Sequence, residues 1–145
     1  MIIKFKKLNK NAHEPVYGTN YSAGADLRAC LEENVEIKPG EVQIVGTGLA
    51  CEIPENFFGM VCSRSGIAAK NGVVVLNSPG IIDSDYRGEI KLILINHSIK
   101  SFIIEHRMRL AQLIIIPFAK VSWQEFDELE STQRNTGGLG STGIR

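Results

Sequence analysis

The chain has 145 residues, which is enough for one compact domain with a buried core but not for two. Sixteen Lys and Arg residues balance sixteen Asp and Glu residues, so no overall charge attracts a nucleic acid backbone or an anionic membrane. We therefore expect neither nucleic acid nor membrane as a partner, and any bound anion must occupy a local site.

The cysteines and the apolar runs favour a reduced, soluble, cytoplasmic protein. Cys30, Cys51 and Cys62 are widely spaced, with no CxxC pair and no histidine arranged as in a metal site. The N-terminus, MIIKFKKLNK, lacks the apolar centre of a signal peptide. The longest apolar run, 113–119, is far shorter than the roughly 20 residues of a membrane helix.

Short segments rich in Val, Ile and Phe recur along the chain, separated by turn signals such as KPGE, PENFFG and NSPG. Residues 3–8 alternate apolar side chains with lysines, which is typical of a strand with one solvated face. Further strands are predicted at 35–38, 42–45, 49–53, 73–76, 90–95, 101–105 and 113–118. Only 65–71 favours a helix, which Gly72 ends. This pattern predicts an all-β sandwich or barrel.

Three internal stretches carry candidate binding groups. SRSG (63–66) offers hydroxyls, a guanidinium and the start of a short helix, which suit a phosphate chain, although a capped helix with an exposed arginine fits equally. Asp26 in AGADL suits a hydrated cation or an ordinary turn. Gln112 lies among apolar neighbours and must find hydrogen-bond partners, in the core or on a ligand.

The stretch GIIDSDYRGE (80–89) concentrates charges between two apolar runs. If Ile82 faces the interior, Asp83 and Asp85 share the opposite face. A carboxylate beside packed isoleucines and near other acids can act as a general base, because desolvation and like charge favour proton uptake. Tyr86 could stack on a sugar or a base. The alternative is an exposed hairpin tip in which Arg87 and Glu89 form salt bridges.

The chain loses its apolar pattern from about Glu125 and ends in RNTGGLGSTGIR. Bare glycine N–H groups can approach a phosphate closely, but the familiar phosphate loop leads from a strand into a helix. The composition therefore leaves two interpretations, a disordered tail or an arm that orders over a bound ligand.

Taken in order, five segments resemble the five motifs of the trimeric deoxyuridine triphosphatases (dUTPases). They are AGADL (23–27), SRSG (63–66), NSPGIIDSDYRGE (77–89), RLAQLI (109–114) and RNTGGLGSTG (134–143). Each alone is a weak signal, but five in this order and spacing are a strong one. The resemblance implies a jelly-roll-like β-barrel with one short helix over residues 1–133 and a mobile glycine-rich arm, 134–145. It also implies a homotrimer whose subunits share active sites.

The implied reaction is hydrolysis of dUTP to dUMP and pyrophosphate, with Mg²⁺ held by the three phosphates and by waters. By position in the motifs, Asp83 matches the general base and Tyr86 matches the ring that packs on deoxyribose and excludes a 2′-hydroxyl. The other matches are Asn77, Gly80, Ile81 and Ile82 to uracil; Arg64, Ser65, Gly66 and Gln112 to the triphosphate; Asp26 to the metal through water; and Arg134, Leu139, Gly140 and Ser141 to the closing arm.

Two positions depart from the family pattern. Leu139 stands where the arm usually carries an aromatic residue, so we expect a weaker apolar lid over uracil. Arg107 and Met108 precede Arg109 where the family usually has Gly-Asp, which changes the turn and its charge. Two alternatives remain: a dCTP deaminase of the same fold, and a non-catalytic regulator that keeps the nucleotide pocket. The complete arm, Asp83 and Tyr86 favour the hydrolase.

Overall fold

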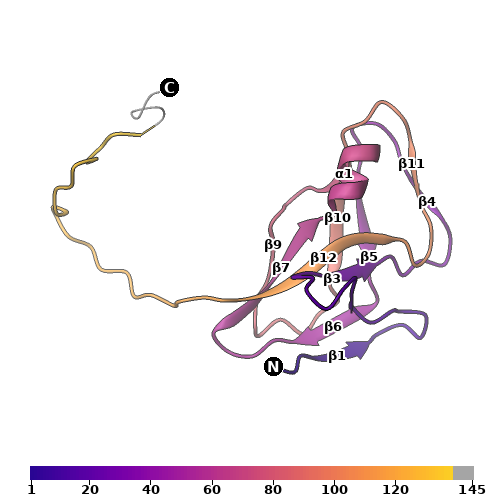
Figure 1. Ribbon diagram of the computed structural model, residues 1–145, viewed down its shortest axis with the longest axis horizontal. Coiled ribbons are helices and arrows are strands. Elements are labelled where there is room, and N and C mark those ends of the chain that lie inside the picture. Colours follow the sequence, from indigo (N-terminus) through magenta and orange to yellow (C-terminus); the bar gives the residue numbers. More distant parts are fainter. Residues whose placement is uncertain (139–145) are drawn as a thin grey trace.

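The computed structural model describes residues 1–138, and this part of the chain is nearly all β-sheet (Figure 1). It contains one helix, α1 (Ser65–Asn71), and twelve strands. The strands are β1 (Lys4–Lys7), β2 (Val16–Tyr17), β3 (Ala25–Arg28), β4 (Val35–Ile37), β5 (Val42–Gly46), β6 (Leu49–Glu52), β7 (Phe57–Ser63), β8 (Val73–Val75), β9 (Gly80–Ile82), β10 (Lys91–Asn96), β11 (Phe102–Ile104) and β12 (Arg109–Pro117).

The strands form a five-stranded sheet in the order β2-β3-β12-β7-β9, a three-stranded sheet β5-β10-β8, and the pairs β1-β6 and β11-β4. All pairings are antiparallel. The longest strand, β12, lies between β3 and β7, where Gln112 is opposite Asp26 on one side and Cys62 on the other. Segments from three separate parts of the sequence are thereby fixed side by side.

The core is filled by apolar side chains that the sheets enclose. Its largest fully buried members are Leu27, Ile37, Val45, Leu49, Ile90, Leu92, Leu94 and Ile104. Two buried polar residues have hydrogen-bond partners, as burial requires. Thr47 Oγ1 donates to the Ile90 carbonyl at 2.7 Å, and Asn96 Nδ2 donates to the carbonyls of Ile37 (2.9 Å) and Lys100 (2.8 Å). These bonds hold the strand ends onto the core.

Most predicted elements are confirmed within one or two residues, and the helix has its predicted bounds. The sequence interpretation missed β2, β3 and β7. PENFFG does contain a turn, because the Phe57 N–H donates to the Pro54 carbonyl and Asn56 has φ 64°, but β7 begins directly after it. The turn interpretation of Asp26 is wrong, since Asp26 lies within β3.

Residues 118–138 leave the sheets and extend away from the body without forming a strand (Figure 1). Nearly all of their side chains are exposed. Within residues 1–138, no helix is long and apolar enough to cross a membrane. Cys30, Cys51 and Cys62 are free thiols.

The turn before β12 forms despite its departure from the family pattern. The Arg107 N–H donates to the Ala29 carbonyl at 2.9 Å, and the Met108 N–H donates to the Glu105 carbonyl at 3.1 Å. The Met108 side chain packs against the core. Arg107, however, has φ 70°, in the left-handed region where a Cβ is unfavourable and glycine is not.

Replacing Arg107 by glycine should therefore raise the free energy of unfolding by about 1 kcal/mol, because the left-handed backbone no longer carries a Cβ. Urea titration at matched protein concentration measures the change. Glu105→Gly, in the same turn but without a positive φ, is the control and should lower stability. A loss of stability in Arg107→Gly would show that the turn is not strained.

Candidate functional site

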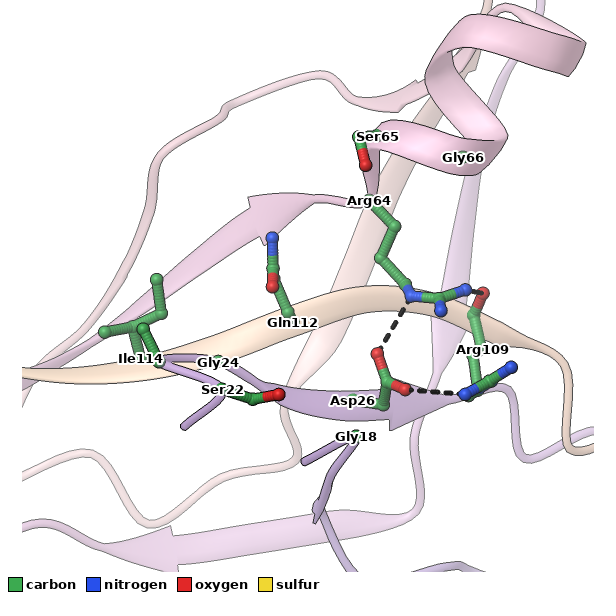
Figure 2. A pocket seen from close by; sticks show the side chains of 11 residues that line it. Gly18, Ser22, Gly24, Asp26, Arg64, Ser65, Gly66, Arg109, Gln112 and Ile114 are labelled. Carbon is green, nitrogen blue, oxygen red and sulfur yellow. Dashed lines mark hydrogen bonds and ion pairs between the residues drawn. The ribbon is translucent and has the colours of Figure 1, made fainter. Parts of the chain in front are cut away.

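A pocket of about 450 Å³ opens where β3, β12 and the start of α1 meet (Figure 2). It is lined by Gly18, Ser22, Ala23, Gly24, Asp26, Arg64, Ser65, Gly66, Arg109, Gln112 and Ile114. Apart from Gly18 and Ser22, these residues come from three of the five motif segments, 23–27, 63–66 and 109–114. The fold thus brings together Asp26, Arg64, Ser65, Gly66 and Gln112, as the sequence predicted.

Three charged side chains form an ion-pair triad at one end of this pocket, which we call the phosphate pocket. Asp26 Oδ1 lies 2.8 Å from Arg64 Nε, and Asp26 Oδ2 lies 3.1 Å from Arg109 Nη1 (Figure 2). Arg64 Nη1 also donates to the Arg109 carbonyl at 3.0 Å. Two guanidinium groups against one carboxylate leave a net positive charge. The triad therefore holds both arginines in place and still favours an anion.

The Gln112 side chain is held by a hydrogen bond and fits into the space left by Gly24, which has no side chain. Its Nε2 donates to the Ser63 carbonyl at 3.2 Å. A Cβ added to Gly24 would lie 2.6 Å from Gln112 Oε1 and 3.0 Å from Gln112 Cβ. Because Gly24 has no side chain, it leaves room for the Gln112 side chain in the pocket. Motif matching did not single out Gly24 or Arg109 as site residues.

A second pocket, of about 330 Å³, contains the candidate base. It is lined by Ile44, Ile81, Ile82, Asp83, Tyr86, Glu89, Lys91 and Ile93. We call it the nucleoside pocket. Ile44, Lys91 and Ile93 were not predicted, because they come from β5 and β10, whose places beside β9 cannot be read from local sequence. Hydrophobic alternation in 42–45 and 90–95 was their only signal.

Tyr86 has a fixed position at this pocket. Its hydroxyl donates to the Glu89 carbonyl at 3.0 Å, and its N–H donates to the Asp83 carbonyl at 3.1 Å. A Cβ on Gly88 would lie 2.5 Å from Tyr86 Cζ, so the ring packs directly on the Gly88 backbone. The ring can act as a rigid wall for a ligand.

The alternation predicted for this hairpin is confirmed: Asp83 and Asp85 are exposed, whereas Ile82 and Ser84 are half-buried. Within the single chain, Arg87 forms no ion pair among residues 1–138. Arg87 Nη1 instead donates to the carbonyls of Ser84 (2.6 Å) and Tyr86 (3.1 Å), which braces the turn.

Glu89 accepts a backbone hydrogen bond and also forms a long ion pair with a lysine. Its Oε1 accepts the Gly48 N–H at 2.8 Å, and its Oε2 lies 4.0 Å from Lys91 Nζ. The first contact attaches the end of the 83–89 loop to the turn between β5 and β6.

Asn77 and Gly80 lie side by side at the start of β9. A Cβ on Gly80 would approach Asn77 Nδ2 to 3.2 Å, and the Ser78–Pro79 peptide between them is cis. Gly80 is buried opposite Val61, while Ile81 opposite Met60 is exposed. The predicted residues Asn77, Gly80, Ile81 and Ile82 therefore form one short strand and its entry turn.

The two pockets do not meet within one chain. β9 pairs with β7 so that Ile82 is opposite Gly59, which places Asp83 beyond one end of the ladder and Arg64 beyond the other. Six strand steps of about 3.3 Å separate the two levels by about 20 Å. Arg64 and Asp83 of the same chain therefore line two different pockets.

Arg134, the one predicted arm residue among residues 1–138, lines neither pocket. Arg134 Nε donates to the Gly137 carbonyl at 2.9 Å, within the extended segment. Leu139, Gly140 and Ser141 lie outside the described residues.

The donor set fits a magnesium ion only together with phosphates. Among residues 1–138, no group of three or more His, Cys, Asp or Glu side chains could hold a metal. Mg²⁺ commonly keeps several waters and binds one or two carboxylates plus substrate phosphates. Asp26 supplies one carboxylate in the phosphate pocket, and its oxygens already contact arginines. Contact through a metal-bound water suits it better than direct ligation.

Comparison with known proteins gives one consistent family. The family model described as dUTPase matches residues 10–143. The deoxyuridine 5′-triphosphate nucleotidohydrolase of Rickettsia bellii is 51% identical over 143 residues, 98% of this chain and 95% of its own. The enzyme of the same name from Rickettsia prowazekii is 50% identical, over 98% and 97% of the two chains.

Solved structures agree in fold. The Staphylococcus bacteriophage 80alpha dUTPase with dUpNHpp matches at a TM-score of 0.90 and 28% identity, over 99% of both chains. A dUTPase variant from phage phi11 of S. aureus, described as coordinating a structural Mg(II) ion, matches at a TM-score of 0.82 and 25% identity, over 90% of this chain and all of its own.

Gly24→Ala should displace Gln112 and weaken binding of inorganic pyrophosphate about five- to ten-fold, since about one hydrogen bond to the anion is lost. Isothermal titration calorimetry measures the affinity. Gly18→Ala is the matched control, because its added Cβ would meet only Ser22 Oγ at an ordinary 3.6 Å. Equal affinities for the two variants would exclude Gln112 as an anion ligand.

Proposed function

The chain belongs to the dUTPase family, and we infer from this that it hydrolyses dUTP to dUMP and pyrophosphate. The family model covers nearly the whole chain, and the Rickettsia relatives at 50% and 51% identity are named for this activity. The convergence of three motifs on one anion-binding pocket is the structural observation that supports it most directly. Such an enzyme, acting in the cytoplasm, removes dUTP from the nucleotide pool, supplies dUMP for dTTP and keeps uracil out of DNA.

The phosphate pocket is proposed to bind the triphosphate. Arg64, Ser65, Gly66 and Gln112 line it, and Asp26 fixes the orientation of Arg64. A guanidinium that is already held in place loses little side-chain entropy when it binds phosphate oxygens, so the pocket is preorganised.

The nucleoside pocket is proposed to bind deoxyuridine. Asn77 and the main chain of residues 80–82 would pair with uracil, because backbone donors and acceptors distinguish uracil from cytosine. Tyr86 would pack on the deoxyribose. Since Gly88 and the Glu89 carbonyl fix the ring, it would not move aside for a 2′-hydroxyl, which predicts discrimination against UTP.

Asp83 is the proposed general base. Its carboxylate takes a proton from a water molecule whose oxygen bonds to the α-phosphorus, while the bond from that phosphorus to the leaving pyrophosphate breaks. Mg²⁺ bound by the phosphates would neutralise their charge, and Asp26 would accept a hydrogen bond from one of its waters. In the single chain Asp83 is exposed, and a partner subunit would supply the water-excluded surroundings of the base.

We propose that three copies of this chain assemble and share their active sites. The separation of about 20 Å between Asp83 and Arg64 in one chain supports a site to which different copies contribute the two residues. The sheet β5-β10-β8 also exposes an apolar face. Ile44 is 64% exposed, Ile81 on the neighbouring β9 is 53% exposed, and Leu76 is 49% exposed. A partner subunit would cover this surface and complete the nucleoside pocket.

The segment 118–138 supports the same assembly. Trp123 and Leu129 are 93% and 89% exposed, with Val121 and Phe126 also largely exposed. Such side chains are rarely left in water, and their own body does not cover them. The segment would run over a partner subunit and bring 134–145 to the active site as a closing arm. Leu139 would then give uracil a weaker cover than an aromatic ring.

A nucleotide panel with Mg²⁺ tests the function. Pyrophosphate release from dUTP should be far faster than from dTTP, dCTP or UTP. Asp83→Asn should bind dUTP normally but lose activity by about 10²–10⁴-fold, since the pocket keeps its shape without the base. Equal rates for all nucleotides would refute the specificity, and ammonia release from dCTP would indicate a deaminase instead.

Deleting residues 134–145 should leave the assembly folded but strongly reduce turnover of dUTP, because the arm adds donors only in the closed state. Size-exclusion chromatography reports the assembly, and steady-state kinetics report turnover. Full activity in the truncated protein would exclude a closing arm, and loss of folding would assign the segment a structural role.

A further inference from the structure

A row of cationic side chains continues from the phosphate pocket along β3. Arg28 lies two residues beyond Asp26 on the same face of the strand, about 7 Å further along. Arg28 is also opposite Arg109 in the pairing of β3 with β12. Its Nη1 donates to the Arg107 carbonyl at 3.0 Å. The pocket and the turn before β12 are therefore joined by neighbouring guanidinium groups.

Two histidines and a lysine lie beside this row. The rings of His13 and His106 have centroids 6.2 Å apart, and His106 Nδ1 accepts the Leu31 N–H at 3.2 Å. Burial lowers the pKa of His13, and the positive charges of Arg107, Arg28, Lys7 and His106 lower it further. His13 is thus surrounded by cationic groups from separate parts of the chain.

The cations of this surface lack acidic partners. The ion pairs within residues 1–138 involve Lys4, Arg64, Lys91 and Arg109, and none involves Lys7, Arg28 or Arg107. Uncompensated charges in a protein with no net charge produce a local field that acts on nearby anions.

Arg107 is the most informative member. Its φ of 70° is suited to glycine, but the chain has an arginine there. The turn itself gains nothing from an arginine there, because its backbone conformation is less favourable with a Cβ. The side chain adds a positive charge next to Arg28, which donates to the Arg107 carbonyl and is opposite Arg109 of the phosphate pocket. Backbone strain at such a place points to a function for the side chain.

We propose that Lys7, Arg28 and Arg107 form a cationic collar that attracts the triphosphate of an incoming nucleotide and guides it into the phosphate pocket. The proposal rests on the dUTPase function inferred above. A polyanion gains attraction from each of these charges before any contact forms, and the gain appears in the association rate. At about 0.1 M salt the Debye length is about 10 Å, so the effect must weaken as salt rises.

Association of the analogue dUpNHpp, followed by stopped-flow fluorescence, tests the collar in Arg107→Gly. This variant removes the charge and also the unfavourable Cβ at a positive φ, so a slower association cannot be attributed to misfolding. At low salt its association rate constant should fall about two- to five-fold, from one charge acting on a polyanion at about 10 Å. The dissociation rate constant and kcat should not change, and the difference should vanish at about 0.5 M salt.

Lys100→Gln is the matched control, because it removes one positive charge from the turn at the other end of β11. It should slow association less than Arg107→Gly. Equal effects of the two variants, an unchanged rate in Arg107→Gly, or a difference that persists at high salt would each overturn the collar. If the wild type cleaves dUTP and Arg107→Gly associates normally, only the collar fails; if the wild type does not cleave dUTP, the proposed function fails.

Discussion

The pairing of β12 with β3 on one edge and β7 on the other is the constraint on which the phosphate pocket depends. It sets Gln112 opposite Asp26 and one residue from Ser63, whose carbonyl holds the glutamine amide. The same pairing brings Arg109 at the start of β12 within 3.1 Å of Asp26. Without this register the guanidinium groups would repel each other with no carboxylate between them.

The antiparallel ladder that builds the phosphate pocket also separates it from the base. β9 pairs with the same β7 that leads into Arg64, but Asp83 follows at the opposite end. A folded single chain therefore holds the two pockets about 20 Å apart along β7. In the proposed trimer, association through the exposed apolar face of β5-β10-β8 would cover Ile44 and Ile81 and bring the two pockets of different chains together.

The strands and the helix that depend on local sequence were mostly predictable. Alternating or continuous Val and Ile runs predicted most strands, and the Gly72 stop predicted the end of α1. β7 was missed because the turn signal at 54–57 was taken to continue into a loop. Pairing with β12 and β9 makes Phe57–Ser63 a strand. β3 was missed because its four residues resemble a turn, and only pairing with β12 settles its conformation.

The site was predictable in its residues but not in its contacts. Ordered motifs identified Asp26, Arg64, Gln112 and Asp83. They could not show that Asp26 bridges two arginines, or that Arg87 donates to backbone carbonyls. Ile44 and Ile93 at the nucleoside pocket were equally invisible, since they depend on strands paired across distant sequence. Arg107 is a different case. The sequence already singled it out as unlike the family pattern, but only its positive φ shows that an arginine there has an unfavourable backbone conformation.

The shared active site is tested most directly by mixing two inactive variants, Asp83→Asn and Arg64→Ala, after unfolding and refolding them together. If Asp83 and Arg64 of one site come from different chains, random trimers should regain about a quarter of the wild-type activity, because about one site in four receives both intact residues. Active sites formed within a single chain would regain none, and that result would contradict the division of the site between subunits.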